Sequence, residues 1–330
     1  MSKNYSTLQK ECQAKLRQSD LQLFNNDVEN GILRGHDYDF VLQNWINNLF
    51  EGIREKMPVY CKSNDIAIHF GSPHLASSFI ACLNHLFPLR SDKNAVLSIA
   101  KIICPDFTEV LPMKNDKDGT QGYISFEVVS NTDHLNESLD GQKLTRGTMC
   151  TSVDACILAK KQNDVNTYLV PIEWKYTESY GNEDKSNGDD GIVRLGRYSN
   201  LITNSKQLKP LDNYKSSVYF FEPFYQLMRQ TLWAEQMIAN KATEIIKADD
   251  FIHVHVIPNG NHNLLRDDLQ INQRRIGYMK GAKTSLIETW TTQLGYTNKY
   301  KIIDPKVLLQ NIDKQKYSDL LTYLKTRYWQ

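Results

Sequence analysis

Glu173 and Lys175 are the side chains whose types and spacing most clearly allow chemistry in this sequence. They are separated by one residue in VPIEWKYTE, residues 170–178, a segment otherwise rich in residues typical of a buried strand. Because side chains alternate along a strand, both groups lie on one face. A carboxylate there can bind a metal ion, and a neighbouring ammonium group can hold a water molecule and stabilise charge on a phosphate.

A second carboxylate is predicted to lie opposite Glu173. Residues 151–160 and 167–175 both have strand character, and the polar segment between them predicts a turn. Antiparallel pairing about this turn places Asp154 directly across from Glu173, with Cβ atoms about 4.5–5.5 Å apart, and a slip of one residue would remove the match. Facing carboxylates repel unless a cation lies between them, and Mg²⁺ or Mn²⁺ prefers such oxygen ligands. The pattern predicts a metal site suited to phosphodiester hydrolysis.

An ordinary salt bridge is the alternative interpretation of these residues. Glu173 and Lys175 could pair on a solvent-facing edge, where such pairs contribute little to stability. The opposite face of both strands favours the catalytic interpretation, because its side chains are apolar and are expected to pack in a core. They are Tyr168, Val170, Ile172 and Trp174 on one strand and Val153, Ala155, Ile157 and Ala159 on the other.

Helical periodicity surrounds this strand region on both sides. The predicted strands are 123–129, 151–160, 167–175 and 251–258. The predicted helices are 6–29, 39–57, 74–87, 93–103, 223–247, 284–294 and 305–326. Residues 181–191, GNEDKSNGDDG, are polar and are expected to form a mobile loop. This order predicts an α/β (α+β) fold, with a central mixed sheet flanked by helices.

Composition and charge limit the classes of function. The 330 residues are 41% apolar and 23% charged, as in a soluble globular protein, and the net charge of +1 gives no global basic field. The N-terminus predicts no secretory signal, and polar residues interrupt the most apolar window, 66–87, so no membrane span is expected. The six cysteines form no Cys-x-x-Cys pair, which favours reduced thiols and a cytoplasmic protein.

Asp154 together with Glu173-Trp174-Lys175 resembles the motif of the PD-(D/E)XK, or restriction-endonuclease-like, nuclease superfamily. The resemblance implies a mixed sheet of about four core strands flanked by helices. It also implies that Asp154 and Glu173 bind Mg²⁺ or Mn²⁺, that the carbonyl of Trp174 adds a ligand, and that Lys175 assists the nucleophilic water. Further segments are similar to a bacterial family of restriction-endonuclease-like proteins over roughly residues 60–300: HLASS at 74–78, NHLFPL at 84–89 and KYTE at 175–178. The implied organisation is an N-terminal helical extension at 1–65 and a nuclease-like domain at 66–330, with its core at about 74–258 and C-terminal helices at 284–326.

The sequence departs from the superfamily pattern at two places. Val153 stands where a proline is common, and the expected first core helix, 74–87, contains no acid although many members carry a glutamate there. Glu127, on the preceding strand, is the candidate for that carboxylate, with an ordinary strand-end glutamate as the alternative. Glu178 could position a second metal or Lys175, but a structural role is favoured.

Three other groups of residues are candidates for a functional role. His253 and His255 share a strand face and His262 follows, a spacing found in zinc hydrolases, but the expected further ligands are not evident nearby and half-buried strand histidines are common. Residues 270–283 carry four positive charges among amides and aromatic groups, which suit phosphate and base contacts or a solvated face. Arg194, Arg197 and Tyr198 also suit either phosphate contacts or a solvated face.

The sequence therefore predicts a cytoplasmic, metal-dependent DNA endonuclease of restriction, phage defence or repair. Its partner is DNA, and a homodimer is possible because cutting both strands often requires two active sites. The first alternative is a non-catalytic nucleic-acid-binding protein on the same fold. The second is an unrelated protein in which the carboxylates form a structural ion pair.

Overall fold

The computed structural model describes residues 3–138, 150–181, 183–265, 279, 281–283 and 285–329. The helices are α1 (Tyr5–Ser19), α2 (Lys56–Ser63), α3 (Ser78–Leu86), α4 (Lys93–Ile103), α5 (Gly188–Thr203), α6 (Phe224–Ala239), α7 (His262–Leu265), α9 (Leu286–Thr292), α10 (Pro305–Leu308) and α11 (Ser318–Arg327). The strands are β1 (Gly31–Leu33), β2 (His36–Tyr38), β3 (Phe107–Leu111), β4 (Ile124–Val128), β5 (Val153–Lys161), β6 (Thr167–Trp174), β7 (Asp250–Phe251), β8 (His253–Val256) and β9 (Tyr300–Ile303).

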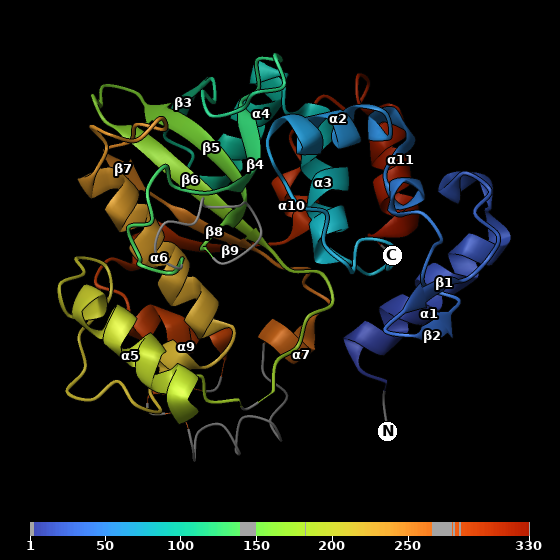
Figure 1. The fold of residues 1–330 in the computed structure, drawn as a ribbon. Coiled ribbons are helices and arrows are strands. Elements are labelled where there is room, and N and C mark those ends of the chain that lie inside the picture. The colour runs from blue at the N-terminus through green and yellow to red at the C-terminus, as the bar shows by residue number, and fades with distance from the viewer. Residues whose placement is uncertain are drawn as a thin grey trace.

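The main sheet has seven strands and is mixed (Figure 1). Strands β3 and β4 both pair antiparallel with one edge of β5, and β5 pairs antiparallel with β6. Beyond β6, the strands β7, β8 and β9 join in parallel pairings. The β5–β6 register runs from Lys160 opposite Thr167 to Ala155 opposite Ile172. This is the predicted register, and the mixed α/β fold class is confirmed.

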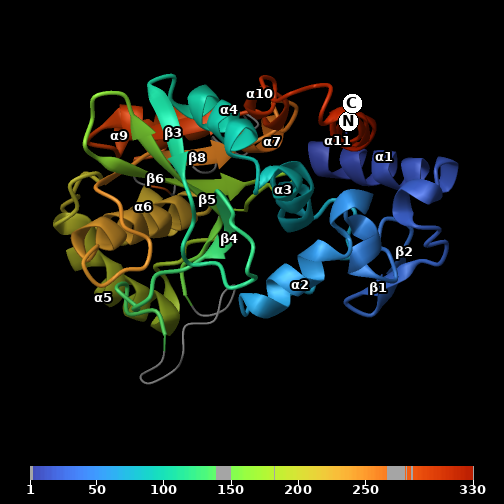
Figure 2. The same ribbon diagram turned by 90° about the horizontal axis from the view of Figure 1, so that it is seen from above.

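Both faces of the sheet are buried, each against its own set of helices. One core contains Ile157 and Val170 of the sheet together with side chains of α2, α3, α4 and α11. The other contains Leu158 and Leu169 together with side chains of α5, α6 and α9. Figures 1 and 2 show α3 and α6 on opposite sides of the sheet. The residues predicted to face a core pack in the first one, except that Val153 packs in the second.

The predicted helix over 39–57 does not form. Short 3-10 turns at Trp45–Asn48 and Glu51–Ile53 take its place, and β1 and β2 form a hairpin before it. Polar side chains explain the difference, because they bind backbone groups that a continuous helix would use. The Asn44 side chain accepts a hydrogen bond from the Ile46 amide, and the Asn48 amide group donates to backbone oxygens of the loop before α3.

Other elements differ from the predicted ones mainly in their ends. The first helix stops at Ser19, α6 stops at Ala239, and the segment predicted as a helix over 305–326 divides into α10 and α11. Strands β3 and β9 were not predicted, and β9 extends the sheet beyond the expected core limit of residue 258 into the expected C-terminal helices. Both of these strands are short, and long-range pairing with β5 and β8 stabilises them.

Residues 181–191 were expected to form a mobile loop, but the described part of this segment is held by backbone contacts and by the start of a helix. Asp184 pairs with Phe221 in an isolated β-bridge, and the Lys185 amide donates to the Phe220 carbonyl at 2.8 Å. Helix α5 then begins at Gly188, whose φ of 70° belongs to the left-handed region that glycine tolerates. Fixed backbone contacts therefore hold residues 183–187, and the acidic side chains of the first helical turn favour the start of α5.

The N-terminal segment is tied to the C-terminal helix by Arg327, which is 2% exposed. Its guanidinium donates to the Asn48 carbonyl at 2.6 Å, to the Tyr323 hydroxyl at 2.5 Å and to the Gln13 side chain at 3.1 Å. The Gln13 amide returns a bond to the Arg327 carbonyl. The division of the chain at residue 65 stays a prediction, but residues before and after it share this buried network. No helix among the described residues is long and apolar enough to cross a membrane.

We expect Arg327→Leu to lower the free energy of unfolding by about 3–5 kcal/mol, because buried acceptors lose their partner. Urea denaturation followed by tryptophan fluorescence measures it, with Lys325→Ala on the exposed side of α11 as the control, which should lie within about 0.5 kcal/mol of wild type. We expect the variant to unfold in a single transition at a lower urea concentration than wild type. A separate early transition would show that the N-terminal segment unfolds independently of this network.

Candidate active site

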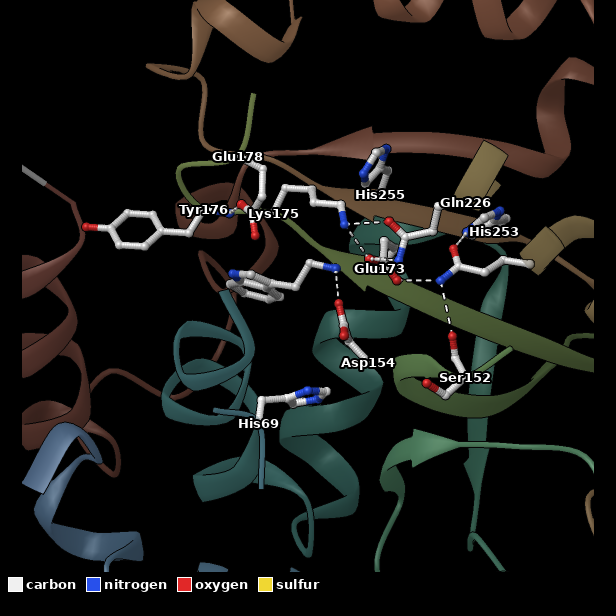
Figure 3. Close-up of polar contacts among 12 residues, drawn as sticks. His69, Ser152, Asp154, Glu173, Lys175, Tyr176, Glu178, Gln226, His253 and His255 are labelled. Carbon is white, nitrogen blue, oxygen red and sulfur yellow. Dashed lines mark hydrogen bonds and ion pairs between the residues drawn. The ribbon is translucent and has the colours of Figure 1, made fainter. Parts of the chain in front are cut away.

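The three residues singled out by spacing lie at the ends of β5 and β6. Lys175 follows the last residue of β6, and its ammonium group lies 2.7 Å from the Glu173 carboxylate. Both side chains are buried, at 3% exposure for Glu173 and 6% for Lys175. Asp154 is half-buried on the adjacent end of β5, in the register that places it across from Glu173. The structure therefore brings the three groups together (Figure 3).

Helix α6 covers this face of the sheet and contributes two glutamines. The Gln226 side chain accepts a hydrogen bond from Lys175 at 2.6 Å and donates one to Glu173 at 2.7 Å. Gln230, four residues later and hence on the same face of the helix, donates to the other carboxylate oxygen of Glu173. The sequence pattern had not pointed to these glutamines. The sequence showed only that Gln226 and Gln230 stand four residues apart among the apolar residues of a predicted helix.

Asp154 is held by the backbone of the opposite strand. Its Oδ2 accepts a hydrogen bond from the Trp174 amide at 2.6 Å. Because the N–H and C=O of one residue point to the same side of a strand, the Trp174 carbonyl is also directed toward β5. The neighbouring Lys175 amide instead donates to Val256 of β8. The one backbone carbonyl implied as a metal ligand is therefore directed toward the strand that carries Asp154.

Glu127 adds a third carboxylate from β4. It is 2% exposed, accepts a hydrogen bond from the Ser152 hydroxyl at 3.1 Å and lies 3.4 Å from His69 Nε2. Its φ of 47° is unusual for a non-glycine residue and reverses the alternation of β4, since Phe126 and Val128 pack in different cores. The hydrogen bond to Glu127 raises the pKa of His69. His69 had not been identified from the sequence as a neighbour of the site.

The carboxylates repel one another across the site. Burial and the charges of Glu173 and Glu127 hold the pKa of Asp154 well above its usual range, against the opposing effect of Lys175. Burial and the charges of the same three carboxylates also raise the pKa of the Cys82 thiol on α3. Burial opposes the charge on Lys175, but attraction to Glu173 outweighs it, so the pKa of Lys175 stays well above its ordinary value.

The histidines of β8 lie beside this cluster without forming a zinc site. His253 and His255 are buried, and burial lowers the pKa of His253 to about 3 and holds that of His255 well below its usual value, which favours neutral rings. His253 Nε2 contacts the Gln230 side-chain oxygen at 3.1 Å, and His255 Nδ1 contacts the Tyr300 hydroxyl at 3.1 Å. Within the described ranges, no group of three or more His, Cys, Asp or Glu side chains is placed to hold a metal ion. His253 instead orients one of the amides that hold Glu173.

The other residues that the sequence singled out lie in different surroundings. The Glu178 carboxylate accepts a hydrogen bond from the Tyr176 amide at 2.7 Å, in line with a structural role. Arg194, Arg197 and Tyr198 lie on α5, and Tyr198 is buried. Most of the basic segment 270–283 lies outside the described residues.

The donor set suits a hard divalent cation. Asp154, Glu173 and the Trp174 carbonyl offer oxygen atoms only, which favours Mg²⁺ or Mn²⁺ over zinc. Burial and the neighbouring charges of Glu173 and Glu127 raise the pKa of Asp154, and a cation would counter the effect of those charges. With two acidic side chains, one carbonyl and solvent as ligands, such a site needs no third acid.

A mixed sheet with an acid on one strand and Glu-x-Lys on the next defines a restriction-endonuclease-like protein. The family model described as restriction endonuclease associating with ARP matches residues 10–329, and the chain belongs to this family. The resemblance found in the sequence is thus confirmed, and over a longer part of the chain than expected. Comparison with curated proteins and with solved structures gives no match.

The raised pKa of Asp154 predicts a pH-dependent effect of Asp154→Asn on the metal-free protein. The folded state keeps a proton on Asp154 that the unfolded state has already released, so wild-type stability falls as the pH rises from the unfolded pKa toward the folded one. Asparagine can still accept the hydrogen bond from the Trp174 amide. It carries no ionisable group, so its contribution to stability does not change with pH. The stability of the variant relative to wild type should therefore increase with pH, by at most about 1.4 kcal/mol per unit.

Urea denaturation in EDTA at several values between about pH 5 and pH 8 measures this difference. Asp164→Asn, in the exposed turn between β5 and β6, is the matched control and should show no such rise. A stability difference that does not change with pH would contradict the electrostatic account of the site.

Proposed function

We propose that this protein is a metal-dependent DNA endonuclease that hydrolyses phosphodiester bonds at Asp154, Glu173 and Lys175. The observation that carries the proposal is the β5–β6 register, which brings Asp154 beside a Glu-x-Lys pair whose side chains are already hydrogen-bonded. Membership of a restriction endonuclease family supports the same activity. Its setting would be restriction, phage defence or repair.

Asp154, Glu173 and the Trp174 carbonyl are the groups that would hold Mg²⁺ or Mn²⁺. When bound, the ion would supply an activated water molecule and neutralise charge on the phosphate. Both oxygens of Glu173 accept hydrogen bonds from Lys175, Gln226 and Gln230. Binding an ion therefore requires Glu173 to exchange at least one of these bonds. Glu127 is the candidate for an additional ligand or for a contact through water.

The proposed role of Lys175 is that of a cation. Burial opposes its charge, but attraction to Glu173 holds its pKa well above the ordinary value, which supports this role rather than that of a general base. An ammonium group at this place can orient the attacking water and stabilise negative charge that develops on the phosphate. Gln226 positions it, because the side-chain oxygen of Gln226 accepts one of its protons.

DNA is the proposed substrate, and the cytoplasm is the proposed compartment. The six cysteines are free thiols, which suits a reducing environment. A homodimer would provide two active sites for cutting both strands. A non-catalytic DNA-binding protein is the second candidate, and the saturated hydrogen bonding of Glu173 is the observation that favours it.

Plasmid cleavage by the purified protein tests the proposal. We expect cutting with Mg²⁺ or Mn²⁺ and none with EDTA. Glu173→Gln and Lys175→Met should each lower the cleavage rate by about 100-fold or more, because each removes a group that acts on the reacting phosphate. The control is Glu109→Gln on β3, whose side chain is 46% exposed and pairs with Lys93.

Linear, single-stranded and modified DNA extend the test if plasmid is not cut. Cleavage by wild type that persists in both active-site variants would place the chemistry elsewhere. Salt-sensitive DNA binding without any cleavage, together with no Mn²⁺ binding by calorimetry, would favour the non-catalytic candidate. Binding of neither DNA nor Mn²⁺ would leave the carboxylates as a structural ion pair.

A further inference from the structure

A small polar cavity of about 250 Å³ lies between α5 and α6. Four basic side chains line it, and two acidic ones accompany them. The basic residues are Lys185, Arg194, Arg197 and Arg229, and the acidic ones are Glu137 and Glu222. Basic side chains therefore outnumber acidic ones in a concave site that can hold one small anionic group.

The internal ion pairs leave part of this positive charge available. Arg229 is 2.7 Å from the buried Glu137 and is committed to it. Arg194 lies 3.3 Å from Asp190, whose side chain is 85% exposed, so this pair is weakened by solvent. Arg197 is half-buried, stacks near the Tyr198 ring and makes no ion pair with any residue that the structure describes. A half-buried guanidinium without a carboxylate partner favours an external anion.

The walls of the cavity are held in place before any ligand binds. Asp184 accepts hydrogen bonds from the Ser186 hydroxyl and the Ser216 hydroxyl, both at 2.6 Å, and these fix the turn that carries Lys185. Arg194 donates to the Lys185 carbonyl at 3.2 Å and joins this turn to α5. On the other side, Glu137 accepts from Tyr198, Arg229 and the Thr151 hydroxyl. A preorganised cation cluster loses little entropy when it binds an anion.

The cavity is next to the candidate active site. Burial raises the pKa of Glu222, and Lys175 is the strongest of the charges that oppose this rise, followed by Lys185. Glu222 therefore lies within the electrostatic reach of both the active-site ammonium and the cavity. Arg229 follows Gln226 by one helical turn on α6, so a single helix presents residues to both sites.

These observations point to one kind of ligand. Guanidinium groups match the oxygens of phosphate in pairs, and the cavity has no apolar wall extensive enough to select a base or an aliphatic group. We infer that the cavity at Lys185, Arg194, Arg197 and Arg229 is a second phosphate-binding site, which holds a backbone phosphate of DNA adjacent to the one at Glu173 and Lys175. This inference rests on the proposed function, since it gives the substrate a second point of attachment.

Arg197→Gln tests the inference through DNA binding in EDTA, where no cleavage can occur. Fluorescence anisotropy of a labelled duplex is measured at several NaCl concentrations. Removing one phosphate contact should weaken binding by about tenfold and reduce the slope of log affinity against log salt by about 0.9. Arg197→Lys should restore the slope, because it restores the charge, but should recover the affinity only in part.

Arg34→Gln is the matched control, because Arg34 is an exposed arginine in the β1–β2 turn, far from α5 in both views (Figures 1 and 2). It should leave affinity and slope unchanged, and urea midpoints should show that all variants are folded. A slope for Arg197→Gln equal to that of wild type would overturn the inference and leave the nuclease proposal standing. Failure of the wild type both to bind and to cleave DNA would instead overturn the proposed function.

Discussion

The carboxylates of Glu127, Asp154 and Glu173 gather in a largely buried part of the sheet, where the Lys175 ammonium group contacts Glu173 and the His69 ring contacts Glu127. Charges in such surroundings interact strongly, so the excess of negative charge must be compensated for the fold to hold together. Burial, together with this excess of negative charge, raises the pKa values of Asp154 and Cys82. A proton on Asp154 relieves this excess in the free protein, and a metal ion would relieve it in the proposed function.

The position of helix α6 is stabilised by the packing of its apolar side chains and by hydrogen bonds that its polar side chains make to the buried acids. Its core residues pack on the sheet, while Gln226 and Gln230 satisfy both oxygens of Glu173. A buried carboxylate without those bonds would cost several kcal/mol, so the amides stabilise the helix position while they orient the acid. His253 extends the arrangement, because a neutral ring bound to Gln230 adds no further charge.

Local patterns in the sequence were sufficient for the centre of the site and insufficient for its surroundings. The turn between β5 and β6, with alternation along each strand, predicted the register and placed Asp154, Glu173 and Lys175, because hairpin pairing is determined by nearby residues. Gln226, Gln230 and His69 reach the site through tertiary packing, which leaves no periodic signal. The predicted helix at 39–57 failed for a related reason: Asn48 binds backbone oxygens more than twenty residues away.

An acidic active site and a polyanionic substrate repel each other, which constrains how such a protein can bind DNA. With a net charge of +1, the chain has no general field to overcome this repulsion. Affinity must come from cations that lie close to the acids yet are not neutralised by them. The charges of Lys175 and Lys185 both act on the Glu222 carboxylate and oppose the rise in its pKa that burial causes. In the proposed function, basic residues on α5 and α6 would attract the DNA backbone, and a metal ion held by Asp154 and Glu173 would supply positive charge at the scissile phosphate.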